Sequence, residues 1–377
     1  MVGGKLFPTQ EIGSLKKAPF LRRTITDLQL REVRYWGELL NVENYQRLQD
    51  ALSRGNYNEK ELYDWAALYA IRFFESAGLD VVWDGEQRRS EMYEYAMEQM
   101  ANIRFVGRVK VWDLETYNKA SVTGEISLRE RRQIEEFLFA KKHARREVKI
   151  PLTGPYTLTD WSFDEYYVNA RRDIADVRER LKRSRIDLLY DVARKGVAPL
   201  IEELYRLGAR RIQIDEPALT TKEDEVETFV DVFNEMRRGI DAVFTVHICY
   251  SDYSLLFPHI LELKAEELSI ECANRDRASL GTSKDVRTGY EILRLFRESG
   301  FDKRIVLGTI DVHTDFIETP ELVRDRIIYA SRVIGNADQI VPSNDCGLRT
   351  RRWEVAWEKE LSLVKGANLA REIYEGR

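Results

Sequence analysis

Four side chains in the second half of the chain are of types that bind transition metals. His247 and Cys249 are two positions apart, and Glu271 and Cys346 follow later in the sequence. Side chains two positions apart on a strand project from the same face, so His247 and Cys249 can hold one ion. One nitrogen, two sulfurs and a displaceable carboxylate suit tetrahedral zinc. The sequence therefore predicts a zinc site, although His-x-Cys alone is equally compatible with a packed core.

Carboxylates and a second histidine could act on a substrate. Glu86 and Asp215 would together suit a cationic group such as an ammonium, with helix capping or an ion pair as the alternative. Asp311 stands two residues before His313, where a carboxylate can orient an imidazole that donates a proton. A surface histidine is the alternative for His313.

Four further residues are of types that could take part in a functional site. Ser14 could donate to a carboxylate through its hydroxyl and backbone N–H, and Gly13 would allow close approach, although a plain turn fits equally well. Trp161 could stack on a flat ligand or pack against neighbouring residues. Cys272 directly follows Glu271, so on a strand it points to the opposite face and is expected to be a buried structural thiol.

Short apolar runs rich in β-branched residues precede most of these positions and predict buried strands. They cover residues 78–83, 148–152, 211–214, 242–246, 267–270, 304–308 and 339–342, with a first strand expected near 5–10. Amphipathic helices are expected between most of them, over residues 59–77, 166–207, 223–238, 285–299 and 320–334. The pattern predicts an α/β fold, a (β/α)8 TIM barrel, in which the C-terminal strand ends share one mouth.

Residues 105–146 fall outside this repeated pattern. We expect a hairpin over residues 106–122 and then a helix opened by Ser127, with Glu130 completing a capping box. We interpret the segment as an insertion within a single barrel of residues 1–377. Its basic side chains could dock an acidic partner, but a solvated face is the expected role of Arg129, Arg131, Arg132, Lys141, Lys142, Arg145 and Arg146.

The composition narrows the class of protein. The 59 Lys and Arg against 64 Asp and Glu leave a net charge of −5, which argues against an electrostatic nucleic-acid binder. The sequence has no apolar stretch suited to a membrane helix, and its N-terminus lacks a secretion signal. Three cysteines do not form a disulfide framework, and together with the missing secretion signal this leads us to expect a cytoplasmic protein. From the net charge and the missing apolar stretch, we expect no nucleic-acid or membrane partner.

Taken in order, the motifs resemble the catalytic barrel of the cobalamin-independent methionine synthase family, in its single-barrel, archaeal-type short form. The resemblance rests on matches along nearly the whole chain. They are Ile12-Gly13-Ser14, Asp84-Gly85-Glu86, Thr153-Gly154-Pro155, Trp161-Ser162-Phe163, Asp215-Glu216-Pro217, His247-Ile248-Cys249, Ser269-Ile270-Glu271, Asp311-Val312-His313 and Asp345-Cys346-Gly347.

This resemblance implies a methyltransferase that methylates the thiol of L-homocysteine to form methionine. It implies four zinc ligands, namely His247, Cys249, Glu271 and Cys346. It also implies that homocysteine is held by Ile12, Gly13, Ser14, Glu86 and Asp215, with Trp161 retained in the substrate site. His313, oriented by Asp311, resembles the family's acid that supplies a proton to the departing methyl donor.

The departures from the family concern the methyl donor. Thr221 replaces a folate-contacting Glu, Arg108-Val109 replaces an Arg-Cys pair, and the family's N-terminal barrel has no counterpart here. These differences favour a methyl-corrinoid donor, free or protein-bound, over methyltetrahydrofolate. Alkyl transfer to another thiol such as coenzyme M is the alternative, but Glu86 and Asp215 suit an ammonium that coenzyme M lacks. A non-catalytic zinc barrel is the second alternative.

Overall fold

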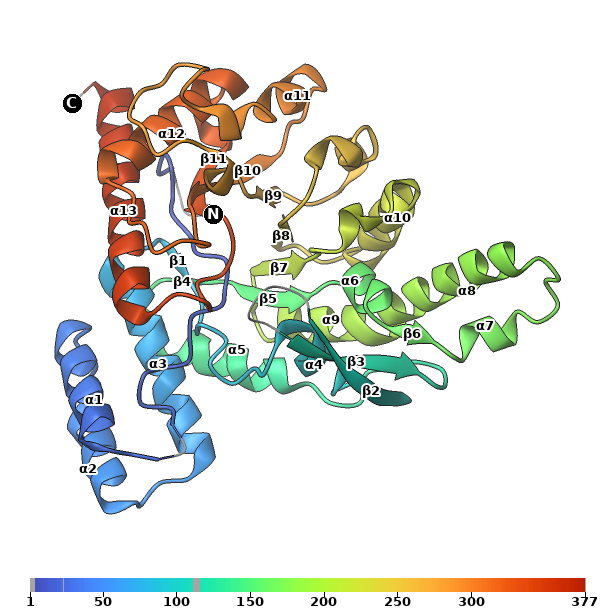
Figure 1. Cartoon of the computed structure of the whole chain (residues 1–377), viewed down its shortest axis with the longest axis horizontal. Helices are drawn as coiled ribbons and strands as arrows, with labels where there is room; N and C mark the ends of the chain where they lie inside the picture. The colour runs from blue at the N-terminus through green and yellow to red at the C-terminus, as the bar shows by residue number, and fades with distance from the viewer. Residues whose placement is uncertain (1–3, 23, 111–115, 377) are drawn as a thin grey trace. The chain divides into compact units, whose positions relative to one another are not determined.

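A computed structural model describes residues 4–22, 24–110 and 116–376 (Figure 1). The chain divides into two compact units. Unit 1 comprises Met1–Arg88, Leu138–Ile150 and Ser269–Arg377, and unit 2 comprises Arg89–Phe137 and Pro151–Leu268. Among the described residues, no helix is both long enough and apolar enough to span a membrane.

Helices make up much of unit 1. They include α1 (Asp27–Leu39), α2 (Tyr45–Arg54), α3 (Glu59–Ala77), α11 (Leu293–Glu298), α12 (Pro320–Ile334) and α13 (Trp353–Glu375). The predicted helices over 59–77 and 320–334 are confirmed to the residue. Asn58 and Thr319 cap the first turns of these two helices, and Gly78 and Gly335 end them in the left-handed conformation.

Parallel strands in unit 1 carry its site residues at their C-terminal ends. β10 (Arg304–Ile310) pairs with β11 (Ile340–Asn344), and β1 (Val81–Val82) pairs with β4 (Glu147–Val148). Gln10 forms an isolated parallel bridge with Val81, and its backbone N–H donates to the Pro342 carbonyl at 3.3 Å.

The predicted first strand over residues 5–10 is therefore wrong, since only the bridge at Gln10 forms there. Phe7 has a φ of 51° and Pro8 has no N–H to donate, so the run cannot make a continuous ladder.

Unit 2 contains its own run of parallel strands. The order is β5 (Ile150–Thr153), β7 (Arg211–Asp215), β8 (Val243–Ile248) and β9 (Glu267–Ile270), and β9 continues along the chain into unit 1. All of these strands except the first residue of β8 are buried, as the apolar runs predicted. Strands alternating with helices confirm the α/β class.

The predicted helix over residues 166–207 is interrupted. It consists of α7 (Tyr167–Ala170), α8 (Val177–Asp191), a π-helical turn (Val192–Val197) and α9 (Ala198–Arg206). α10 (Val226–Met236) lies within the predicted stretch 223–238. The short α4 (Met92–Met97) and α6 (Pro155–Asp160) were not predicted.

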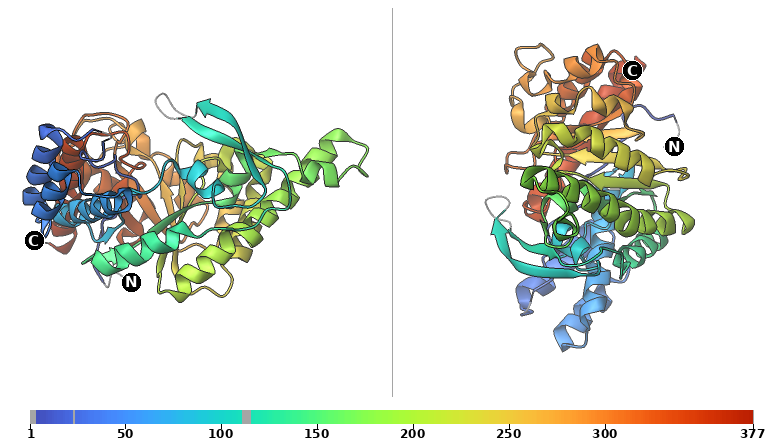
Figure 2. Two further views of the ribbon diagram at one scale, coloured as in Figure 1. Left: turned by 90° about the horizontal axis from the view of Figure 1, so that it is seen from below. Right: turned by 90° about the vertical axis from the view of Figure 1, so that its right-hand side faces the viewer.

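The expected hairpin forms between residues 103 and 122. β2 (Ile103–Lys110) and β3 (Thr116–Val122) are antiparallel neighbours (Figure 2), and β6 (Phe163–Asp164) extends the sheet beside β3. Residues 111–115 of the predicted hairpin lie outside the described residues.

The predicted start of the following helix at Ser127 is wrong, because α5 (Arg132–His143) begins later. The Ser127 carbonyl accepts from Ala101 N–H, and Leu128 bridges to Met100, so this backbone is already committed to extended pairing. Two of the basic side chains form ion pairs within unit 2: Arg131 with Glu203 at 2.9 Å and Arg132 with Glu98 at 2.8 Å.

Candidate active site and metal ligands

The metal-type residues of unit 2 lie at the end of β8. His247 and Cys249 are both 3% exposed, and their ligand atoms lie within 4.8 Å of each other. Tyr250 then takes a φ of 55°, which turns the chain away from the strand, and the Ser251 hydroxyl donates to the Cys249 carbonyl at 2.9 Å. The structure thus brings together the two residues that the His-x-Cys spacing paired.

Asp215 ends the neighbouring strand β7 directly beside this pair. Asp215 and His247 are partners in the parallel register of β7 and β8. Gln213 donates its side-chain N–H to Asp215 Oδ1 at 2.7 Å, which fixes the carboxylate. A buried carboxylate and a metal-type residue therefore lie side by side at two strand ends.

Glu216, the next residue, is a buried anchor that the sequence reasoning did not single out. Its carboxylate accepts from the backbone N–H of Tyr156 at 3.0 Å and of Thr157 at 2.7 Å, and from the Thr157 hydroxyl at 2.7 Å. A Cβ on Gly154 would lie 2.1 Å from Glu216 Oε1, so only glycine fits there. Burial raises the pKa of Glu216 to about 8, and the hydrogen bonds oppose this shift.

Trp161 is stacked on Tyr117 of strand β3. The Trp161 and Tyr117 rings have centroids 5.0 Å apart and an interplanar angle of 15°. Tyr117 is 5% exposed, and its burial raises its pKa to about 12. Tyr117 of the hairpin therefore supports one face of the Trp161 ring. No local sequence signal indicated this contact.

The Ile12-Gly13-Ser14 segment of unit 1 is held by two strand-end loops. Gly13 adopts a φ of 152°. Leu15 N–H donates to the Gly85 carbonyl at 3.0 Å, and the Ser14 carbonyl accepts from Leu348 N–H at 2.8 Å. A Cβ on Gly347 would lie 2.0 Å from Ser14 Oγ, so the loop after Cys346 closes tightly on Ser14.

Glu86 directly follows Gly85, whose carbonyl binds the Leu15 N–H next to Ser14. It has a φ of 55°, an uncommon conformation for a non-glycine residue, and it is buried. Its N–H donates to Asp84 Oδ1 at 2.9 Å, and its carbonyl accepts from Lys17 Nζ at 2.9 Å. Asp84 also pairs with Arg88 at 2.9 Å, so an ion pair between the buried Asp84 and the partly exposed Arg88 supports the turn that carries Glu86.

Glu271, Asp311 and His313 meet at the ends of β9 and β10. Glu271 is 1% exposed at its side chain and pairs with Arg275 at 2.9 Å. The His313 imidazole Nε2 lies 4.0 Å from Glu271 Oε2. Asp311 Oδ1 accepts from the backbone N–H of His313 at 2.8 Å, so Asp311 fixes the main chain that carries this histidine.

The three cysteines differ in exposure. None of the three, all of which lie within the described residues, forms a disulfide; Cys249 and Cys272 are buried and Cys346 is partly exposed. Burial raises the pKa of Cys272 well above its usual range, as expected for a structural thiol. Donor types that suit zinc occur in both units: His247 and Cys249 belong to unit 2, and Glu271 and Cys346 belong to unit 1.

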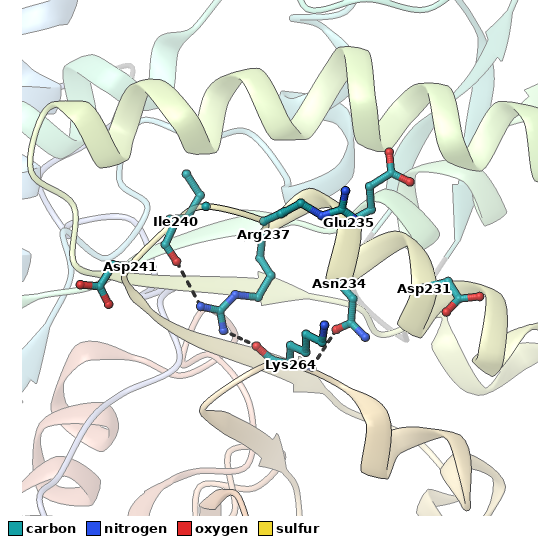
Figure 3. A pocket seen from close by; sticks show the side chains of 9 residues that line it. Asp231, Asn234, Glu235, Arg237, Ile240, Asp241 and Lys264 are labelled. Atoms are coloured by element: carbon teal, nitrogen blue, oxygen red, sulfur yellow. Dashed lines mark hydrogen bonds between the residues drawn. The ribbon is translucent and has the colours of Figure 1, made fainter.

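A surface pocket in unit 2 is separate from these residues (Figure 3). Its lining comes from α10, from the turn that follows this helix and from one later residue: Asp231, Asn234, Glu235, Arg237, Arg238, Gly239, Ile240, Asp241 and Lys264. Arg237 crosses it and donates to the carbonyls of Ile240 and Lys264, so its guanidinium is already engaged. None of the predicted site residues lines this pocket.

Known proteins resemble this chain along almost its whole length. Residues 40–368 match the family model described as the catalytic domain of cobalamin-independent synthase. A methionine synthase from Thermoplasma acidophilum is 34% identical over 96% of this chain and 97% of its own, and one from Saccharolobus solfataricus is 32% identical over 97% and 96%.

A solved structure agrees with these sequence matches. A B12-independent methionine synthase from Shewanella sp. W3-18-1, in complex with selenomethionine, has a TM-score of 0.75 and 25% identity over 99% of this chain and 100% of its own. The fold is thus the predicted TIM-barrel class. A methyl-corrinoid donor, expected from Arg108, Val109 and Thr221, is at odds with a family described as cobalamin-independent. The chain belongs to the cobalamin-independent methionine synthase family and is a methyltransferase.

Proposed function

We propose that the chain transfers a methyl group to the thiol of L-homocysteine and so forms methionine. One observation carries this proposal: the parallel register sets the carboxylate Asp215 beside the metal-type residue His247. Homocysteine has an ammonium at one end and a thiol at the other, which match a carboxylate and a soft metal respectively. Coenzyme M has a sulfonate and no ammonium, so it leaves Asp215 without a role.

We propose zinc as the metal, bound by His247, Cys249, Glu271 and Cys346. The burial of His247 and Cys249 and the short separation of their ligand atoms support this assignment. Zinc would supply a Lewis acid that keeps a bound thiol deprotonated at neutral pH. Glu271 would be the one oxygen donor of the four, and so the ligand best suited to give up its place to a substrate thiol.

The remaining residues would bind the amino-acid end of the substrate and move a proton. Asp215 and Glu86 would pair with the ammonium, and Ser14 with its Gly13 turn would donate to the carboxylate. The tight loop contacts around Ser14 support a preorganised anion site. His313 would donate a proton to the donor as the methyl group leaves, and Asp311 would hold its main chain.

The methyl donor is best decided by direct comparison. Methionine formation from homocysteine would be measured with zinc-loaded protein, side by side with methyltetrahydrofolate polyglutamate and methylcobalamin. The family description leads us to expect turnover with the folate, for which the Trp161–Tyr117 stack offers a flat support. Turnover with methylcobalamin alone would restore the corrinoid expectation. No methionine from either donor, while coenzyme M is methylated, would overturn the choice of homocysteine.

The zinc assignment has its own test. Cys346→Ser removes a thiolate, and we expect zinc retention and methyl transfer to fall together to roughly a tenth of wild type or less. Cys272→Ser is the matched control, because Cys272 is buried and assigned no ligand role. A Cys346→Ser protein with stoichiometric zinc and full rate would remove Cys346 from the site.

A further inference from the structure

Asp345 connects the residues proposed as metal ligands in unit 1. It directly precedes Cys346, and its side chain is fully buried. Its carboxylate reaches the turn that directly follows Glu271. Oδ1 accepts from the backbone N–H of Cys272 at 2.8 Å and of Ala273 at 2.9 Å, and Oδ2 accepts from Asn274 N–H at 2.6 Å.

Strand β10 lies between β9 and β11 and leaves room for this carboxylate. Gly308 lies on β10, where a Cβ would stand 1.9 Å from Asp345 Oδ1 and 3.0 Å from its Cα. Asp345 N–H donates to the Ile310 carbonyl at 2.9 Å, which fixes the main chain before Cys346. A buried carboxylate is stabilised when several backbone N–H groups converge on it, and here three do so.

We propose that Asp345 is a positioning residue for the metal site, holding Glu271 and Cys346 at a fixed spacing. This inference rests on the proposed zinc site. Asp345 is covalently adjacent to the thiol ligand and hydrogen-bonded to the backbone adjacent to the carboxylate ligand. A displacement of its side chain would therefore move two of the four donors relative to each other.

Asp345→Asn is the direct test, because it keeps the volume but replaces one acceptor oxygen with an amide that donates. At least one of the three N–H groups then loses its partner. Outer residues that orient ligands typically contribute about 10–100-fold to metal affinity. We expect zinc affinity, measured by chelator competition, to fall by that factor, with a changed thiolate-to-metal absorption in the cobalt(II)-substituted protein.

Two further variants make the test specific. Gly308→Ala leaves Asp345 in place but occupies its path, so it should reproduce the loss of zinc affinity. Asp80→Asn is the matched control: Asp80 is also buried in unit 1 and accepts a backbone N–H, from Thr9 at 2.9 Å, but it precedes β1 rather than following a strand. It should lower the melting temperature without changing zinc affinity.

The outcomes separate this inference from the proposed zinc site. If the wild type binds no zinc, or Cys346→Ser keeps it, the zinc site itself fails. If those two results stand and both Asp345→Asn and Gly308→Ala bind zinc as the wild type does, only the role of Asp345 is overturned. Failure of both variants to fold in the absence of metal would assign Asp345 to the fold alone, and would also overturn the proposal.

Discussion

His313 and Glu271 face each other in unit 1, with 4.0 Å between the imidazole Nε2 and the carboxylate Oε2. The proposed proton donor therefore lies beside the proposed ligand that a thiol would displace. The His313 side chain is 28% exposed, whereas that of Glu271 is 1% exposed, so His313 can exchange protons with solvent while Glu271 stays enclosed.

His313→Gln tests this division of roles. Removal of a general acid typically costs about 10²–10⁴-fold in rate, and we expect methyl transfer to fall within that range while zinc content is unchanged. Activity and metal content would be measured on the same preparation. Loss of zinc in His313→Gln would instead make His313 a ligand, and an unchanged rate would exclude it as the acid.

Asp215→Asn should discriminate between substrates. A charged hydrogen bond typically contributes about 1.5–3 kcal/mol, so homocysteine binding should weaken by roughly 10–100-fold. A deaminated thiol analogue should be affected far less, because it has no ammonium. The exposed Asp231, in the same unit, provides the control variant Asp231→Asn. Equal losses for both thiols would contradict the role of Asp215.

Gly154→Ala should displace Glu216 from the backbone that it caps. The new Cβ would meet Oε1 at 2.1 Å, and such overpacking typically destabilises a protein by about 1–3 kcal/mol. Denaturant unfolding would measure the change for Gly154→Ala, Glu216→Gln and the double variant. We expect the double variant to be less destabilised than the sum, because both changes break the same contacts. Simple additivity would show that the two residues act independently.

Glu360 gives the protein a predicted pH dependence of stability. Burial in α13 raises its pKa to about 8, with an opposing hydrogen bond from Asn344 Nδ2 at 2.6 Å. The folded state therefore binds this proton more tightly than the unfolded chain. Its contribution is complete at acidic pH, below the pKa of the unfolded chain, and is lost as the pH rises through about 8.

Melting temperatures of wild type and Glu360→Gln, measured between about pH 5 and 9, would test this sign. We expect the wild type to lose stability relative to Glu360→Gln as the pH rises, because glutamine has no proton to release. A constant difference between the two melting curves would contradict the raised pKa of Glu360.

Local signals account for the parts of the fold that the sequence predicted. α3 and α12 have caps at both ends, so their bounds could be read from Asn58, Gly78, Thr319 and Gly335. α13 was missed because it buries charged residues such as Lys359 and Glu360, which weakens its apolar periodicity.

Some residues of the candidate site could be proposed from local sequence signals, and others could not. His247, Asp215 and Glu271 could be proposed from the sequence because each ends or directly follows a buried apolar run, where parallel strands place functional residues. Glu216 and Asp345 could not, because each binds the backbone of a loop far away in the sequence. For Asp345 a signal was available in Gly308, a glycine within the apolar run of β10, which indicates close approach of another group.

The pairs Gly154–Glu216 and Gly308–Asp345 also constrain which substitutions this sequence can accept during evolution. Each glycine is needed only while its acidic partner occupies the adjoining space, and each acid can reach its N–H donors only past a bare Cα. A substitution at one member therefore removes the selective value of the other. Among descendants of this sequence, the members of each pair should be retained or lost together, whichever methyl donor those descendants use.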